Sequence, residues 1–460
     1  MKKLLILAAT STLALTACME TTNPPRPVVT APQSWAATAA APMAINTTPV
    51  TAQWWETFGS TELNTTITTA LAKNNDLNAA LHRIEQARAS LRIAGADLKP
   101  TVSGNANASV NRDDPSQGSA STRKSISTGL DVSYELDLFG ANQAAVDAAT
   151  ASLDASMYDR DALALVTMAD TAKTYFTLVN ARERMSLARN DLDNRREILR
   201  IVKARFDAGS GTALDVAQQE SSVTASEASL KSLQAAEANA NTALALLLGQ
   251  TVQETPVSAQ QLATLNTPHV ETGQPSSLLE RRPDIKSAEA DLIGAGANIT
   301  AARAAFYPSI NLGSGFNITK SPLGDPLATA LSIAASLSVP IFEGGRLEGG
   351  VERATAQQAE LAENYRKAIL TAFKEVEDAL TAFNTAEDRS ALLVTSMQQA
   401  QIAYDLTRKK FDAGAIDLQS VIETQNTLLS AQDSHAQARM TMLSAAVDLY
   451  KALGGGWQGK

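Results

Sequence analysis

Residue types that can do chemistry are scattered through this chain. The three histidines, His82, His269 and His435, have no cysteine or carboxylate at a spacing that suits a metal ion. No nucleophile, base and orienting group recur together. Carboxylates are abundant, but nothing in the sequence pairs two of them at the separation that glycoside chemistry needs. We therefore expect no enzyme, no metal site and no cofactor.

Charged residues do gather at two near-identical stretches. Residues 205–216 are RFDAGSGTALDV, residues 410–421 are KFDAGAIDLQSV, and Phe206 lies 205 positions before Phe411. The same offset aligns the LALLLG and LYKALG segments that follow the two stretches. Taken alone, these charges are typical of solvated helix ends. The repetition indicates that almost the whole body of the chain is duplicated.

Each stretch also contains the residues that end one helix and begin another. Gly209 and Gly414 lie where a glycine would take the left-handed conformation after a helix. Thr212 and Asp417 are suitable caps for the helix that follows. Each stretch therefore predicts the tip of an antiparallel helical hairpin.

Long helices must position these tips. Residues 141–208 and 351–413 contain neither glycine nor proline, which predicts helices of about 100 Å at 1.5 Å per residue. Apolar residues recur every seventh position in both runs, as in helices that pack along their length. Shorter helices at Glu62–Leu98 and Asp284–Ala305 could stack end to end with the return helices.

Two segments of strict alternation precede each long helix. Leu130, Val132 and Tyr134 alternate with polar residues, and the same pattern recurs near residues 102–110, 310–318 and 331–339. Segments of about ten residues with one apolar face are typical of outer-membrane strands. Four strands cannot close a barrel alone, but three chains would supply enough.

The N-terminal segment MKKLLILAATSTLALTAC indicates export. Two lysines precede an apolar stretch that is too short to span a membrane. It ends in a sequence resembling a lipobox, so we expect cleavage before Cys18, the only cysteine, and lipidation there. A proline-rich tether follows. The net charge of −9 and the lack of a basic stripe argue against nucleic acid as a partner.

The segments RRPDI, YELDLFG and VPIFEGGR, together with the FDAG hairpins, resemble the outer-membrane factor family of TolC-like ducts, especially its lipoprotein efflux branch. The resemblance covers almost everything from Trp54 to Gly454. It implies a mainly α chain with a small β part, in which long helical hairpins form a periplasmic α-barrel. Four strands per chain would contribute to a 12-stranded trimeric outer-membrane β-barrel.

On this basis the chain divides into a signal peptide (1–17), a lipidated tether (18–50), a first structural repeat (51–250), an equatorial linker (251–277), a second repeat (278–454) and a C-terminal tail (455–460). The elements expected in the first repeat are strands at about 101–112 and 124–138, a long helix at 141–208 and a return helix at 212–248. Those expected in the second are strands at about 309–319 and 329–341, a long helix at 346–413 and a return helix at 416–453.

The resemblance also implies a gate at the hairpin tips. In the family, carboxylates at the start of the final helix close the periplasmic end, and the matching residue is Glu423. Asp215 matches an acidic residue whose usual tyrosine partner is Phe411 here, without a hydroxyl. The residues expected at the gate are Glu423, Gln419, Asp417, Asp215 and Phe411, with Arg408, Lys409 or Lys410 as substitute partners for Asp215.

The implied function is that of a passive exit duct for small amphipathic compounds. It would act as a homotrimer in outer-membrane lipid, with a periplasmic adaptor and an inner-membrane transporter of the RND type. Two alternatives stay open: the same duct serving metal-ion efflux or polypeptide secretion, and a lipid-anchored helical scaffold without a channel.

Overall fold

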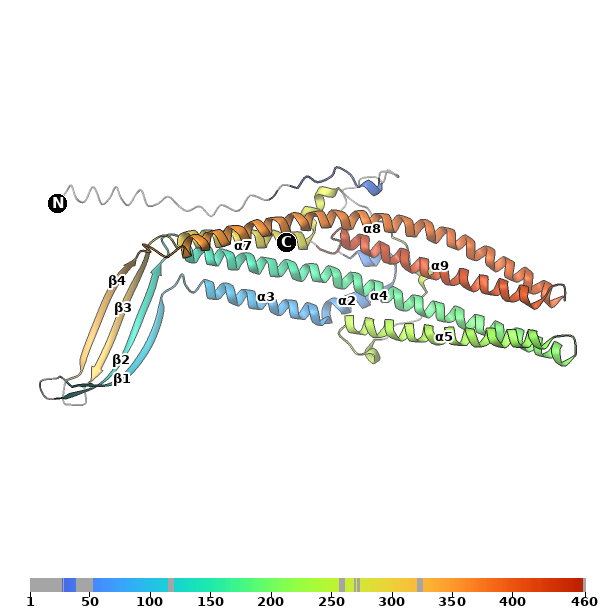
Figure 1. The fold of residues 1–460 in the computed structure, drawn as a ribbon, viewed down its shortest axis with the longest axis horizontal. Helices are drawn as coiled ribbons and strands as arrows, with labels where there is room; N and C mark the ends of the chain where they lie inside the picture. The colour runs from blue at the N-terminus through green and yellow to red at the C-terminus, as the bar shows by residue number, and fades with distance from the viewer. Residues whose placement is uncertain are drawn as a thin grey trace. The chain divides into compact units, whose positions relative to one another are not determined.

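The computed structural model describes residues 27, 29–38, 53–114, 120–255, 261–268, 270, 274–320 and 326–457. This part of the chain is mainly helical with one four-stranded sheet, as predicted (Figure 1). Cys18, the signal peptide and most of the tether lie outside the described residues. The described residues fall into two units, which we call the strand unit (within 82–157 and 286–367) and the hairpin unit (within 29–81, 158–285 and 368–457).

The helical elements follow the duplicated plan, in the chain order α2 (Thr61–Lys73), α3 (Asn75–Ala94), α4 (Ala141–Asp207), α5 (Ala213–Leu247), α6 (Leu278–Arg281), α7 (Pro283–Ala304), α8 (Arg346–Asp412) and α9 (Leu418–Ala452). Short 3-10 turns are η1 (Ala36–Thr38), η2 (Trp54–Phe58), η3 (Val252–Glu254), η4 (Leu262–Thr264) and η5 (Pro275–Ser277). The long helices α4 and α8 have 67 residues each. No helix in the described ranges combines the length and the apolar character that crossing a membrane requires.

The sheet of the strand unit is antiparallel, with its strands in chain order: β1 (Thr101–Asp113), β2 (Ser121–Leu136), β3 (Ser309–Lys320) and β4 (Ala328–Ser338). Two strands end earlier than the sequence predicted. β2 ends at Leu136 and β4 at Ser338, where the sequence predicted ends at about residues 138 and 341. Pro340 has no N–H to donate to a ladder, and Gly140 has a φ of +73° that turns the chain into α4.

One face of this sheet is apolar and has no cover within the described chain. The register pairs Leu130 with Phe316, and Phe316 with Leu331, so three apolar side chains form one row across β2, β3 and β4. Their exposed fractions are 55%, 44% and 71%. Polar pairs occupy β1 and β2, where the Asn105 amide donates to the Asp131 carboxylate at 2.5 Å. An apolar row in register with nothing over it is typical of a strand face that contacts lipid.

Close helix packing explains the glycine-rich stretch of α7, residues 293–298. A Cβ placed on Gly294 would lie 3.3 Å from the Cβ of Ala151 in α4, within the strand unit. Gly294 is inside a helix and no strand runs into it. Small residues therefore let α7 and α4 approach each other.

The helix expected at residues 62–98 is broken at Asn74. The buried Asn74 side chain accepts hydrogen bonds from the N–H groups of Asp76 and Leu77 at 2.9 and 3.1 Å. Its amide donates to the carbonyl of Leu247 at 2.9 Å, at the end of α5. The expected continuous helix was wrong because an asparagine that bonds to nearby backbone competes with the helical ladder.

The second repeat has the corresponding joint, with an arginine in place of the asparagine. Arg282 pairs with Asp284 and Glu375 at 2.7 Å each and donates to the carbonyl of Ala452 at 3.2 Å. Burial lowers the pKa of the guanidinium, but the two carboxylates outweigh burial and raise it. Arg282 therefore joins the start of α7 to α8 and to the end of α9.

Only glycine fits where the return helices meet these joints. Gly249 and Gly454 follow α5 and α9 with φ of +60° and +72°. A Cβ on Gly454 would lie 2.5 Å from the carbonyl oxygen of Arg281, and one on Gly249 would overlap the carbonyl oxygen of Lys73. In the hairpin unit the shorter helices thus abut end to end, as the sequence suggested.

Aromatic residues form the core of the hairpin unit beside these joints. Trp54 stacks on Tyr450 with ring centroids 5.3 Å apart, and Phe58 lies 5.3 Å from Phe176. Trp54, Phe58 and Phe176 are at most 1% exposed. This cluster ties η2 to both α4 and α9.

Candidate functional site at the hairpin tips

The tips of both hairpins have the turn geometry expected from the repeat. Gly209 and Gly414 have φ of +74° and +71°. After α4, the N–H of Gly209 bonds to the Phe206 carbonyl, and after α8 the N–H of Gly414 bonds to the Phe411 carbonyl, each at 2.9 Å. These bonds, with the next N–H reaching one residue further back, form a Schellman motif that satisfies the last carbonyls of each helix.

The caps of the return helices differ between the two hairpins. Thr212 and Asp215 form a reciprocal capping box at the start of α5. At the start of α9, the Asp417 carboxylate accepts from the N–H and hydroxyl of Ser420 at 2.9 and 2.7 Å. The Ser420 hydroxyl, followed by its N–H, lowers the pKa of Asp417. The Asp215 and Asp417 carboxylates therefore take part in capping α5 and α9, the helices that they begin.

The clasp expected between Asp215 and the basic cluster is not formed in the described chain. The Asp215 carboxylate is engaged by Thr212, whose N–H and hydroxyl donate to it at 3.0 and 2.7 Å. Arg408 pairs with Asp412 of its own helix at 3.2 Å. Lys409 and Lys410 are exposed. Within the described chain, local capping and i,i+4 pairing thus engage Asp215 and Arg408 in their own helices.

Glu423 and Gln419 lie together on the exposed face of α9. The Gln419 amide donates to the Glu423 carboxylate at 2.9 Å, one helical turn apart. Both side chains face away from the buried side of α9. The carboxylate is therefore free to face solvent or another chain, while Gln419 sets its orientation.

Phe411, which was expected as a poor substitute for tyrosine, is buried and has a cationic partner that the sequence analysis missed. It belongs to an apolar cluster shared by both hairpins: Ile198, Val202, Tyr404, Phe411, Leu418, Val421 and Leu428. The guanidinium carbon of Arg205 lies 4.4 Å from the centre of the Phe411 ring. The Arg205 guanidinium also donates to the Phe411 carbonyl at 3.3 Å.

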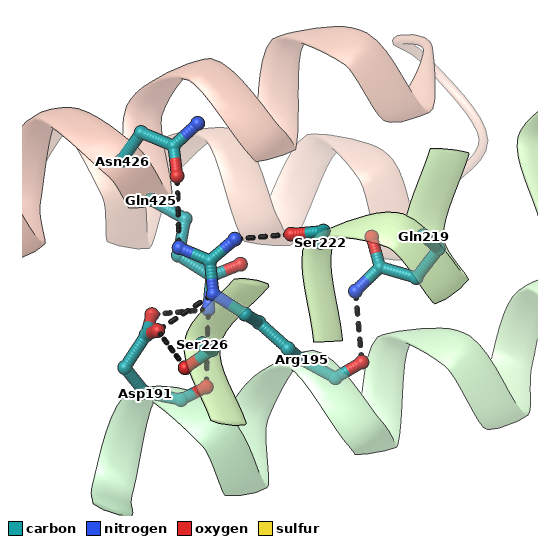
Figure 2. A network of polar contacts seen from close by, with 7 residues as sticks. All are labelled: Asp191, Arg195, Gln219, Ser222, Ser226, Gln425 and Asn426. Carbon is teal, nitrogen blue, oxygen red and sulfur yellow. Dashed lines mark hydrogen bonds and ion pairs between the residues drawn. The ribbon is translucent and has the colours of Figure 1, made fainter. Parts of the chain in front are cut away.

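A buried ion pair lies on α4 behind the tips (Figure 2). Arg195 and Asp191 are one turn apart, bonded at 2.6 Å, and each side chain is only 6% exposed. Arg195 further donates to the Ser222 hydroxyl of α5 and, at 2.8 Å, to the Asn426 amide oxygen of α9. One arginine therefore joins three helices.

The rest of this network satisfies the carboxylate. The Ser226 hydroxyl and the Gln425 amide donate to Asp191 at 3.0 Å each, and Gln219 donates to the Arg195 carbonyl at 2.8 Å. Figure 2 shows these side chains converging from α4, α5 and α9. Because buried charges are costly without partners, the network specifies how the first hairpin packs on α9.

An open groove of about 670 Å³ lies beside the network. It is lined by small residues of α5 and by a mixed face of α9: Ala217, Ser221, Ala225 and Ser229, with Gln419, Ile422, Asn426 and Leu429. The groove holds no clustered metal ligands, and no such cluster of histidine, cysteine and carboxylate residues occurs elsewhere in the described ranges.

Comparisons with known proteins agree with this architecture. The family model for outer membrane efflux proteins matches residues 66–250 and 274–455. The pyoverdine export outer membrane protein OpmQ of Pseudomonas aeruginosa is 40% identical, with 100% of this chain and 98% of the relative covered. The cation efflux system protein CusC of Escherichia coli K12 is 29% identical over 96% of this chain and 97% of the relative.

Solved structures of outer-membrane channels share the fold. The outer-membrane channel OprN superposes with a TM-score of 0.85 at 28% identity, covering 94% of this chain and 99% of that one. The Campylobacter jejuni CmeC outer membrane channel gives 0.88 at 27% identity, with 94% of each chain covered. The repeated hairpins, the four-stranded sheet and the matched residues place this chain in the outer membrane efflux protein family.

Proposed function

We propose that this chain forms, as a homotrimer, the outer-membrane exit duct of a tripartite efflux system. The uncovered apolar row of the sheet carries the proposal, because three chains with four strands each can pool their strands into one closed barrel in lipid. Conduction would be passive. An inner-membrane transporter of the RND type would supply the energy, and a periplasmic adaptor would bridge it to the duct.

Lipidation of Cys18 would anchor the duct from the periplasmic side. One acyl chain binds a membrane only marginally, whereas a multiply acylated cysteine together with a barrel anchors a protein permanently. Mass spectrometry of the mature N-terminus checks this part of the proposal.

Deleting the gene in its host should sensitise the cells to several unrelated amphipathic toxicants. A plasmid copy should restore the wild-type inhibitory concentrations. The deletion is best made in a strain without redundant ducts, since another family member could mask the loss. Unchanged sensitivity in that strain, with no conductance from the purified protein in a planar bilayer, would favour the scaffold alternative.

A second candidate function is export of pyoverdine or a similar compound, as in the OpmQ relative named for pyoverdine export. The identity to OpmQ is 40% over the whole chain, against 29% to CusC. Complementation separates the two candidates. Expression in a Pseudomonas aeruginosa strain lacking OpmQ would restore pyoverdine in the medium if the chain accepts that cargo and its partners.

Glu423 is proposed as the ring of charge at the closed end of the trimer. Three exposed carboxylates around one axis attract cations, so Glu423→Gln should lower the cation-to-anion permeability ratio of single channels. Glu197→Gln is the matched control, since Glu197 pairs with Arg200 on the surface of α4. Equal selectivity in both variants would remove Glu423 from the gate.

A further inference from the structure

We propose that Arg205 is the latch that holds the two hairpin tips of one chain together, and that opening of the duct requires Arg205 to leave Phe411. This inference rests on the proposed function, because a latch regulates conduction only in a chain that conducts. In this proposal, the contact between the Arg205 cation and neutral groups of Phe411 takes the role that the sequence suggested for a clasp at Asp215.

The contact is a cation–π interaction supported by a hydrogen bond. The 4.4 Å separation between the Arg205 guanidinium and the Phe411 ring centre is within the range of about 6 Å for such interactions. The Phe411 ring is 2% exposed, so water does not compete for this side of the guanidinium. Among the described residues, the guanidinium of Arg205 contacts the ring and the carbonyl oxygen of the same residue, Phe411.

The position of Phe411 at the end of α8 strengthens this contact. Its carbonyl is one of the last in the helix and also accepts from the N–H of Gly414 at 2.9 Å. The C-terminal end of a helix has partial negative charge, which favours a cation nearby. Arg205, on the last turn of α4, therefore complements the end of α8 in the other hairpin.

Among the described residues, the aromatic ring at the first hairpin tip has no counterpart of this contact. The repeat aligns Phe206 with Phe411 and Arg205 with Lys410. Phe206 is 45% exposed, whereas Phe411 is buried, and the described residues place a cation over the second ring but not over the first. The two nearly identical tips therefore differ: Phe411 is buried and contacts a cation, whereas Phe206 is exposed.

The buried network of Arg195 limits how far the opening motion extends along the hairpins from their tips. Arg195 lies ten residues before Arg205, about 15 Å along α4, and its guanidinium, which is paired with the buried Asp191, also donates to neutral groups of α5 and α9. Breaking the Arg205 contact leaves the Arg195 contacts intact. Opening would then be confined to the last turns of the hairpins.

The test compares Arg205→Gln with Arg200→Gln in purified full-length protein. Arg200 is on the same helix and pairs with Glu197, so its replacement is an equal charge change at an exposed site. In planar bilayers, Arg205→Gln should raise the open-to-closed ratio by roughly 2- to 30-fold per protomer, the range that a cation–π contact supports. Phe411→Leu removes the ring but keeps the carbonyl, so its rise should be no larger, and the double variant should not exceed Arg205→Gln.

Hydrogen exchange of the tip peptides reports on the latch without requiring conduction. Exchange in residues 206–213 and 411–418 should accelerate in Arg205→Gln and stay at the wild-type rate in Arg200→Gln. If Arg205→Gln matches Arg200→Gln in exchange, the latch is refuted. If the wild type never conducts, the proposed duct is refuted, while the exchange comparison still decides whether Arg205 holds the tips.

Discussion

Replacing Arg195 with methionine is expected to destabilise the helical hairpins by about 3–5 kcal/mol, because the Asp191 carboxylate would remain buried without its cation. The measurement is chemical denaturation of the purified protein, followed by circular dichroism at the helical band. The loss should be large because Arg195 bonds to α5 and α9 as well as to Asp191, so three helices lose a common partner.

Two further variants isolate the cause. Arg200→Met removes an arginine of an exposed pair, which is worth at most about 1 kcal/mol. In the double variant Arg195→Met with Asp191→Asn no unpaired buried charge remains, so much of the stability should return. An Arg195→Met protein as stable as Arg200→Met would show that the buried pair does not hold the hairpins.

Gly249→Ala should be the second most damaging substitution, with a loss of about 2–5 kcal/mol. An alanine at a φ of +60° costs about 1–2 kcal/mol by itself. The added Cβ would also overlap the Lys73 carbonyl, and overpacking of this kind costs about 1–3 kcal/mol more. The same denaturation assay measures the sum.

Gly209→Ala is the matched control for this joint. Its φ of +74° imposes a similar strain, but nothing lies within 4 Å of the position of its Cβ. The difference between the two variants therefore reports the end-to-end contact of α5 with α2. Equal losses of unfolding free energy in the two variants would mean that the Lys73 carbonyl moves aside at little cost. The positive φ would then account for the whole effect.

Local sequence patterns were sufficient to predict the architecture. Glycine-free runs predicted α4 and α8, alternation predicted the four strands, and the two FDAG stretches predicted the hairpin turns with left-handed glycines. These features depend on periodicity and on the conformational freedom of glycine, which act over a few residues. The break at Asn74 was missed although asparagine is a preferred helix N-cap, and its further bond to the Leu247 carbonyl appears only in the tertiary structure.

The partners and the burial of the site residues could not be predicted from local sequence patterns. Asp215 and Arg408 looked available for a clasp, but each finds a partner within its own turn of helix. Arg195, Arg196 and Arg200 stand within six residues on α4, and the sequence does not tell which of them is buried. Their angular positions on the helix decide it: Arg195 alone faces both α5 and α9, and its side chain is 6% exposed.

By itself, the sequence determined the duplicated plan, the hairpin turns and the apolar face of the strands, because each follows from residue type and spacing along one segment. Only the tertiary structure decided that Phe411 is covered by Arg205 while Phe206 is exposed, and that Arg195 rather than its neighbours is the shared partner. The reason is physical. Burial and ion pairing depend on which helix faces meet, and two near-identical stretches become different once each packs against a different neighbour.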